Sequence, residues 1–418
     1  MNLFKTKKTD HWALERFTIG FVVLSALMVI VLIYSFCMYT VAQANIISNK
    51  SMYSTTFTLS KTQTTGSVQG VYTGKDHKKA FVLLKFDNVD SMSTDANNYQ
   101  AFLTGADVDQ NSTYIQSAPA GSIYVFGTTG YMGVYLANNE GFPQQILDLT
   151  IRANKQLVDN QDSATMGQNQ DESFAKYDQF KIYFNPAGAD AKKIKCLNGS
   201  QIPSKLDLFK QTVVNSQMHQ IKKDLNGKLA KLKADISQIQ EFSQRLDKTH
   251  GVKLVAPPAI IAGDSIEQDD KTGKYDVKFK TTVAGGYNFD WQTNKNPLDM
   301  LIRQQHNKNM TYDQYFAMKS QQRKDDDSSN SEFDTTNIQW VLKDETPVED
   351  LNTGSDTGRY VTINNDIQSL MNAWSTYYGD KKTYQTTDLE TLLALQAQTK
   401  QVKQITSVNT HKKAVMLY

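Results

Sequence analysis

Residues that build metal sites and disulfide frameworks are scarce in this chain. Its 418 residues include only two cysteines and six histidines. These counts exclude a disulfide framework and a cysteine-based zinc site, and they leave little material for a histidine cluster. Cys37 lies in a long apolar run, so Cys196 is the only thiol beyond that run. We therefore expect no structural metal, no cofactor and no disulfide.

An excess of charge of one sign is also lacking. The chain has 45 basic and 43 acidic residues, and 39% of its residues are hydrophobic. This composition excludes a disordered polyelectrolyte. It also argues against nucleic acid as a partner, because chains that bind nucleic acid normally concentrate positive charge.

Catalytic motifs are the third absence. The sequence has no G-x-S-x-G elbow and no H-E-x-x-H motif, and Cys196 has no neighbours typical of a catalytic cysteine. The glycines of residues 127–133 lack the Lys-Ser/Thr of a phosphate-binding loop. We assign no catalytic residue and expect a protein that is not an enzyme. Paired carboxylates acting on glycan or peptide stay open, because 43 acidic residues offer many pairs.

One long apolar run is present near the N-terminus. No charged residue occurs from Phe17 to Asn49, and residues 17–41 are almost continuously apolar. About 20 apolar residues cross the hydrocarbon core of a bilayer, so this run predicts a transmembrane helix in contact with membrane lipid. Ala42-Gln43-Ala44 resembles a signal-peptide cleavage site, but secretory apolar regions span only about 7–15 residues. An uncleaved signal anchor is therefore favoured over a cleaved signal peptide.

The charges beside this run predict its orientation. Residues 1–16 carry four basic and two acidic side chains, whereas the outer flank has only Lys50 and Lys61 in its first twenty residues. By the positive-inside rule, residues 1–16 form a cytoplasmic tail and the rest of the chain is extracytoplasmic. We expect a single-pass protein of the cell membrane. Its part beyond the tail has 41 residues of each sign and is electrically neutral.

Strand patterns follow a polar stretch that we interpret as a stalk at residues 42–54. Short apolar segments alternate with turn residues, which predicts an antiparallel β-sandwich-like domain over residues 55–203. Gly127 and Gly130 supply a tight turn between two of these segments. The polar stretch 160–173 is interpreted as a long loop. The predicted strands are residues 80–86, 123–126, 131–136, 145–152 and 180–184.

A heptad pattern comes next. Leucine and isoleucine recur at alternating steps of four and three, which predicts a long helix or coiled coil over residues 204–250, ended by His250-Gly251. Three heptads are the minimum for a coiled coil, and a long amphipathic helix packed on its own domain is an open alternative. On the coiled-coil interpretation the chain is a homo-oligomer. Its oligomerisation residues are Leu225, Leu229, Leu232, Ile236 and Ile239.

Mixed signals predict an extracytoplasmic α+β domain over residues 251–418. Alternation through residues 275–283, the turn at residues 284–286 and alternation back through residues 287–291 predict a hairpin. Predicted helices begin at Asn296-Pro297, at the capping box Thr311–Gln314 and at the capping box Thr387–Glu390, and another helix stops at Gly379. An acidic loop is predicted at 324–332, and strands are predicted at 338–342 and 414–418. The whole chain is thus a membrane-anchored α+β protein.

Two segments are candidates for ligand binding. Asp107–Thr113 has the oxygen-ligand spacing that opens a calcium loop, but Ser112 and Ala118 stand where glycine and glutamate are needed, so a solvated turn is favoured. Tyr287, Phe289 and Trp291 fall on one face of a predicted strand, as suits a carbohydrate platform. Packing in a hydrophobic core is the favoured alternative for these aromatic residues. We assign no metal ligand.

A resemblance to a known group rests on layout and two segments. The segments are Phe126-Gly127-Thr128-Thr129-Gly130-Tyr131-Met132-Gly133 and Gly286-Tyr287-Asn288-Phe289-Asp290-Trp291. Together with the short basic tail and the single span, they resemble uncharacterised single-span surface proteins of Gram-positive conjugative elements. The layout is also similar to that of the bitopic assembly factor of type IV secretion channels. The excess of lysine over arginine and the lack of disulfides are in keeping with a Gram-positive surface.

Two classes of function follow. The resemblance, the neutral ectodomain and the heptad helix favour a non-enzymatic scaffold or interaction subunit of a cell-envelope complex, in conjugative type IV secretion, with other envelope proteins as partners. The aromatic strand and the abundant carboxylates favour the alternative. That alternative is a cell-surface ligand-binding protein or enzyme acting on wall glycan or peptide.

Overall fold

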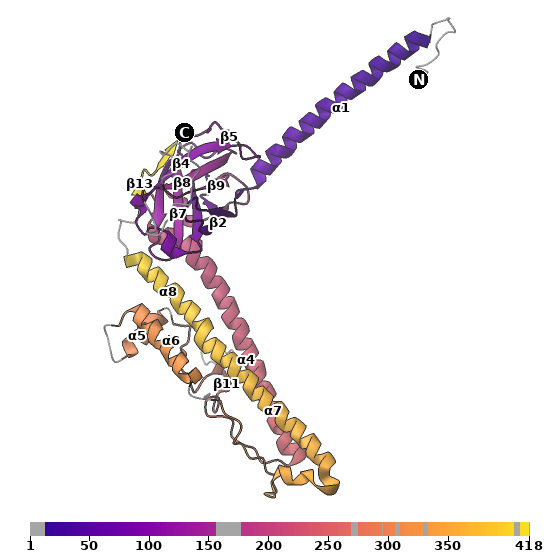
Figure 1. Cartoon of the computed structure of the whole chain (residues 1–418), viewed down its shortest axis with the longest axis vertical. Helices are drawn as coiled ribbons and strands as arrows, with labels where there is room; N and C mark the ends of the chain where they lie inside the picture. The colour runs from indigo at the N-terminus through magenta and orange to yellow at the C-terminus, as the bar shows by residue number, and fades with distance from the viewer. Residues whose placement is uncertain are drawn as a thin grey trace. The chain divides into compact units, whose positions relative to one another are not determined.

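The chain forms two compact units in a computed structural model (Figure 1). Unit 1 contains Met1–Leu208 and Ile405–Tyr418, and unit 2 contains Phe209–Gln404. The residues that the structure describes are 13–155, 177–268, 275–294, 296–305, 310–328, 333–404 and 410–417. The loop predicted at residues 160–173 lies outside them.

Unit 1 begins with the apolar helix α1 (Ala13–Asn49). Within it Thr18–Asn49 is long and apolar enough to cross a membrane, and among the described residues none covers its most apolar stretch. The helix continues through most of the expected stalk, because residues 42–49 contain no glycine or proline to end it. In its last turn the side-chain amide of Asn185 donates to the carbonyl of Ile47, and the Ala189 N–H donates to the carbonyl of Ser48. These bonds attach the end of α1 directly to the folded part of unit 1.

Two β-sheets make up the body of unit 1. The larger sheet has the order β1-β2-β3-β7-β6-β13, with β10 paired to β2. Its strands are β1 (Thr56–Thr58), β2 (Thr65–Thr73), β3 (Lys79–Phe86), β6 (Ala120–Val125), β7 (Tyr131–Ala137), β10 (Lys192–Lys193) and β13 (Thr410–Lys412). The smaller sheet has the order β14-β4-β8-β9, with β5 paired to β4. Its strands are β4 (Tyr99–Ala106), β5 (Ser112–Thr113), β8 (Ile146–Ala153), β9 (Gln179–Phe184) and β14 (Val415–Leu417).

The two sheets share one hydrophobic core. Val82 and Val134 of the larger sheet and Leu103, Leu149 and Ile182 of the smaller sheet belong to the same buried cluster. In a strand, alternate side chains point to opposite faces, so each sheet gives one face to this core. The antiparallel β-rich domain predicted from the sequence is therefore confirmed, and all five predicted strands are present.

The hairpin between β6 and β7 forms where the glycines predicted it. Gly127 and Gly130 both have positive φ angles, of 67° and 79°. The Phe126 N–H donates to the carbonyl of Tyr131 across the turn. The glycines are needed because a side chain with a Cβ is strained in this left-handed region.

The last described strands return to unit 1. β13 pairs antiparallel with β6, and β14 pairs parallel with β4, and Figure 1 shows this yellow segment among the magenta strands. Ala414, between them, is fully buried in the core of unit 1. The division of the chain thus differs from the predicted domain of residues 251–418: its end belongs to the sandwich, and the preceding long helix belongs to unit 2.

Unit 2 is built on two long helical stretches. The predicted helix at 204–250 appears as α3 (Lys205–Phe209), a π-helical segment (Lys210–Val214) and α4 (Asn215–His250), with Gly251 as its left-handed cap. The second stretch contains α7 (Thr357–Thr383), the π-helical segment η7 (Tyr384–Asp388) and α8 (Leu389–Gln404). The shorter elements are α5 (Pro297–Gln304), α6 (Tyr312–Ser328), β11 (Ser265–Gln268) and β12 (Tyr275–Lys278). Short 3-10 helices lie at Val89–Ser91, Ala96–Asn98, Lys195–Leu197, Val348–Asn352 and Gly354–Asp356.

The helix boundaries in unit 2 can be compared with the helix starts and stops that were predicted from the sequence. The box at Thr311 and Gln314 is confirmed: the Thr311 N–H donates to Gln314 Oε1 over 2.9 Å, and the Gln314 N–H donates to Thr311 Oγ1 over 3.3 Å. The stop predicted at Gly379 is wrong, because α7 continues through it. The box predicted at residues 387–390 is wrong as well, since Thr387 lies inside η7. A glycine costs a helix only about 1 kcal/mol, which the packing of this long stretch outweighs.

The hairpin predicted at residues 275–291 is also wrong. β12 pairs with β11, and residues 287–291 form no strand. The glycine turn exists, with a φ of 62° at Gly285. Gln385 replaces the cross-strand bonds, because its side-chain oxygen accepts from the Val283 N–H and its backbone carbonyl accepts from the Tyr287 N–H.

Two smaller predictions also need correction. The first part of the predicted loop 324–332 is the last turn of α6, and residues 329–332 lie outside the described part of the chain. At residues 338–342 only isolated bridges form, at Val341 and Leu342.

Candidate functional site: an aromatic and polar pocket

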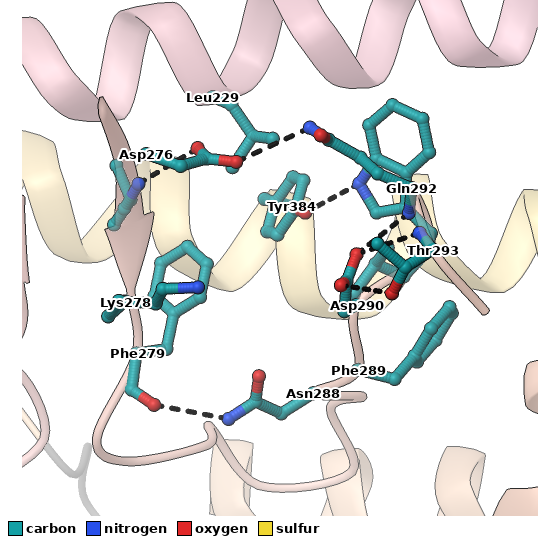
Figure 2. Close-up of a pocket in the computed structure, with 13 residues that line it drawn as sticks. Leu229, Asp276, Lys278, Phe279, Asn288, Phe289, Asp290, Gln292, Thr293 and Tyr384 are labelled. Atoms are coloured by element: carbon teal, nitrogen blue, oxygen red, sulfur yellow. Dashed lines mark hydrogen bonds between the residues drawn. The ribbon is translucent and has the colours of Figure 1, made fainter. Parts of the chain in front are cut away.

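A pocket of about 350 Å³ opens within unit 2 (Figure 2). One wall is β12 with the residue after it, and the opposite wall is the loop 288–293. Leu229 of α4, Tyr384 of η7 and Leu389 of α8 complete the lining. We call this the β12 pocket. Four separate segments of the chain build it, so its lining could not be read from any one stretch of sequence.

Aromatic rings form the inner part of the β12 pocket. The ring of Phe279 stacks on that of Tyr384, with centroids 5.4 Å apart and planes at 29°. The indole N–H of Trp291 donates to the Tyr384 hydroxyl over 3.0 Å. Burial raises the pKa of Tyr384, so the hydroxyl stays neutral and serves as an acceptor. The three rings therefore hold one another in fixed positions.

Carboxylates stand on two sides of the pocket. Asp276 Oδ1 accepts from the Val277 N–H over 2.8 Å, and Asp276 Oδ2 accepts from Gln292 Nε2 over 3.3 Å. Asp290 accepts from the backbone N–H groups of Gln292 and Thr293 and from the Thr293 hydroxyl. Burial acts to raise the pKa of Asp290, but these hydrogen bonds and the nearby Lys278 outweigh it and hold the pKa below its ordinary value.

Lys278 and Asn288 complete the polar lining. In Figure 2 the ammonium group of Lys278 and the amide of Asn288 reach into the same space, and the carboxylate of Asp290 lies across from Lys278. Asn288 Nδ2 donates to the carbonyl of Phe279 over 3.3 Å, which orients its amide oxygen. Phe289 also lines the pocket, and in Figure 2 its ring lies on the side of the loop away from Lys278. The pocket thus presents donors and acceptors around aromatic rings.

A buried ion pair holds the wall that carries Phe279. Lys381 of α7 is fully buried, and its Nζ donates to Asp264 Oδ2 over 2.6 Å, to the carbonyl of Ile260 over 2.6 Å and to Thr281 Oγ1 over 2.8 Å. The Tyr377 hydroxyl donates to the same Asp264 oxygen over 2.9 Å. Desolvation by burial and the Asp264 charge both raise the pKa of Tyr377. All three ammonium protons are used, so this group is a structural anchor for residues 260–281.

A carboxyl pair lies between α4 and α7. Asp235 is buried and faces Asp380, whose Oδ2 is 2.7 Å from the ammonium of Lys231. Burial, followed by the hydrogen bond and the charge of Asp380, raises the pKa of Asp235 to about 6. One lysine thus faces two carboxyl groups, and the pair favours sharing a proton.

The five predicted oligomerisation residues lie inside unit 2. Four of them are buried, and Ile239 is partly buried against the same cluster. That cluster includes residues of α7 and α8, such as Ile367, Leu370 and Leu393. The heptad face is therefore covered by the chain's own helices, as the alternative of an amphipathic helix packed on its own domain requires. The buried four are Leu225, Leu229, Leu232 and Ile236.

The two ligand-binding candidates fare differently. Tyr287 and Trp291 are buried in the core of unit 2, while Phe289 only packs against it. Trp291 and Phe289 line the β12 pocket, but Tyr287 does not. At residues 107–113, Asp107 accepts from the backbone and side-chain N–H groups of Asn111 and forms a turn. Among the described residues, no three His, Cys, Asp or Glu side chains are grouped to hold a metal ion.

Most of the residues that line the pocket were not predicted from the sequence. Asp276, Lys278 and Gln292 gave no signal of their own, because isolated polar residues beside a strand are normally solvated. Tyr384 was hidden within a helical stretch. The alternating aromatic residues at 287–291 were the one sequence pattern that pointed to the pocket, and they mark part of the wall formed by the loop 288–293.

Comparison with known proteins adds no relative. No protein family, no curated protein and no solved structure matches the chain. The properties of the β12 pocket and of α1 therefore have to carry the functional argument alone.

Proposed function

We propose that the chain is a single-pass membrane protein whose two folded units lie on the extracytoplasmic side and act as an interaction subunit of a cell-envelope complex. The observation that carries this proposal is α1, because none of the residues that the structure describes covers its most apolar stretch. Apolar surface of that size is stable in lipid and aggregates in water. The basic flank of residues 1–16 supports a cytoplasmic N-terminus.

The junction after α1 supports a scaffold role. Ser51, Tyr53 and Ser54 continue from the helix into the sandwich, where the Tyr53 and Ser54 N–H groups donate to the carbonyl of Tyr183. In the proposed topology these hydrogen bonds hold unit 1 close to the membrane surface. A protein built in this way positions its partners at a set distance from the bilayer.

Labelling of single cysteines tests the topology. In a full-length Cys37→Ser/Cys196→Ser background, Tyr114→Cys places a thiol on an exposed side chain of unit 1, and Thr6→Cys places one in the tail. A maleimide that cannot cross membranes should label the first variant in intact protoplasts and the second only after permeabilisation. The reverse pattern would overturn the orientation. Release of a soluble product that begins at Asn45 would replace the anchor with a cleaved signal peptide.

The envelope complex is proposed from the resemblance to conjugative surface proteins. Its test is cross-linking of the full chain in its own cells, followed by purification. Recovery of the ATPases and channel proteins of a type IV secretion system supports the proposal, and recovery of wall-synthesis enzymes alone contradicts it. Ligand binding at the β12 pocket is the second candidate function, because rings and polar groups converge there.

A further inference from the structure

We propose that the β12 pocket binds a neutral pyranose sugar. The proposal does not depend on the membrane topology, because every residue that carries it belongs to unit 2. Three features of the pocket limit the chemistry of a ligand: its charge, its free hydrogen-bonding groups and its aromatic wall.

The charges of the lining residues disfavour an anionic ligand. Asp276 and Asp290 face the pocket against the single ammonium of Lys278. A phosphate, a nucleotide or a uronic acid would meet two carboxylates for one cation and be repelled. A purely apolar ligand would strip water from all three charged groups without replacing their hydrogen bonds. A neutral, polar ligand avoids both costs.

The pocket offers both donors and acceptors of hydrogen bonds to a ligand. Lys278 is exposed and can donate up to three hydrogen bonds, while the amide oxygen of Asn288 can accept. Asp276 and Asp290 each keep acceptor capacity beyond the bonds they already make. A sugar hydroxyl both donates and accepts, so neighbouring hydroxyls can bridge Lys278 on one side and Asp290 on the other.

The aromatic wall suits the C–H face of a pyranose ring. Phe279 is fixed by its stacking on Tyr384 and by the nearby Lys381 ammonium, which is 5.7 Å from the ring centroid. Its ring is only partly buried in the unbound chain. A pocket of about 350 Å³ lies within the size range of small-molecule sites and accommodates one or two sugar rings.

Titration of the full chain in lipid nanodiscs tests the proposal. The probes are methyl β-D-glucopyranoside, D-glucosamine and D-glucuronate, each followed by saturation-transfer NMR and calorimetry. We expect saturable binding of the neutral sugar and of glucosamine, and binding of glucuronate at least about tenfold weaker, because it adds a carboxylate to a pocket that already has two.

Matched variants assign the binding to the pocket. Lys278→Gln should weaken binding of the neutral sugar about tenfold or more through loss of charge-assisted hydrogen bonds. Lys280→Gln is the control, because it lies two residues further along the same wall and does not line the pocket. Phe279→Leu keeps an apolar side chain but removes the ring, and it should also weaken binding, with unit 2 shown to be folded by hydrogen exchange.

Several outcomes would overturn the proposal. They are absence of saturable binding by all three probes, glucuronate binding as tightly as the neutral sugar, and equal binding by the Lys278→Gln and Lys280→Gln variants. Competition by inorganic phosphate would show an anion site in its place.

Discussion

The two units differ in how their buried polar groups are partnered. In unit 1 the core is apolar, and the buried polar side chains tie loops to strand ends, as when Asp178 Oδ1 accepts from the Lys61 and Thr62 N–H groups. In unit 2 an ion pair, Lys381 with Asp264, is buried among the helices. Sheets satisfy their backbone groups by pairing, whereas the irregular residues 279–287 have no ladder and need side chains from α7 and η7. Both units have a large apolar core, and unit 2 depends in addition on a buried ion pair.

Loss of the buried cation should have the largest effect. We expect Lys381→Met to destabilise unit 2 by about 3–5 kcal/mol, because Asp264 is left buried without its partner. Protection in unit 1 should be unchanged. Hydrogen exchange followed by mass spectrometry reports both units in one sample. Adding Asp264→Leu should recover much of the loss, since replacing a whole buried pair by apolar residues is often nearly neutral.

The control for this variant is Lys222→Met on the exposed surface of α4. Equal protection in the Lys381→Met and Lys222→Met proteins would show that the ion pair does not hold unit 2 together.

A cavity in the helical core should cost slightly less. Leu232 is fully buried in unit 2, so Leu232→Ala should destabilise that unit by about 3 kcal/mol. The mass of the particle by light scattering should stay the same, because the side chain packs within its own chain. Gln240→Ala, exposed on the same helix, is the control. Dissociation of an oligomer by Leu232→Ala without loss of protection in α7 would restore the coiled-coil interpretation.

A substitution that overpacks the core of unit 1 is the matching test for the β-sandwich. A Cβ added at Gly133 would collide with the ring of Phe81 on the neighbouring strand. We expect Gly133→Ala to destabilise unit 1 by about 1–3 kcal/mol while unit 2 is unaffected. Gly199→Ala meets open space and is the matched control. A simultaneous loss of protection in both units would show that they unfold together.

The smallest effect is a pH dependence confined to unit 2. The pKa of Asp235 is about 6 in the folded chain against an ordinary 3.8, so the folded chain holds this proton more tightly than the unfolded chain. The stability that results is complete below pH 3.8 and is lost as the pH rises through 6. Asp235→Asn should flatten this slope and stabilise unit 2 at pH 7–8 by on the order of 1–2 kcal/mol.

Groups that face Asp235 set the size of this effect. Lys231 lies one turn away on α4, and Asp380, Tyr377 and the Lys381–Asp264 pair lie on the packed side. Denaturant titrations between pH 4 and 8 measure the slope, with Asp224→Asn on the exposed side of α4 as control. An unchanged slope in the Asp235→Asn protein would contradict the assignment.

Sequence patterns were informative wherever a local signal matched the final structure. Residues 80–86 and 131–136 are strands because their continuous apolar runs are buried on both faces of a sheet. The helix through residue 250 and its glycine cap follow from a heptad pattern and one left-handed residue. In these places local preference and tertiary packing agree, so sequence alone was sufficient.

The pattern failed where tertiary contacts replaced local ones. Alternation at 275–291 described a hairpin, but Gln385 takes the backbone bonds that a second strand would have made. The heptad face was compatible with a partner chain or with packing on its own domain, and the helices that cover it come from residues more than a hundred positions later in the sequence. The β12 pocket joins α4, β12, the loop 288–293 and the stretch from η7 into α8, and no single-sequence pattern reports which distant segments meet.

The return of β13 and β14 to unit 1 has a consequence for biogenesis. These strands are synthesised after unit 2, yet they pair with β6 and β4, and Val415 packs closely at Gly121. While the chain is being synthesised, the edges of β6 and β4 that these strands cover stay open until residues 410–417 have been made. Open strand edges are templates for aggregation and for capture by chaperones. Completion of the sandwich is thus delayed until after unit 2 has been synthesised, although most of its strands are made first.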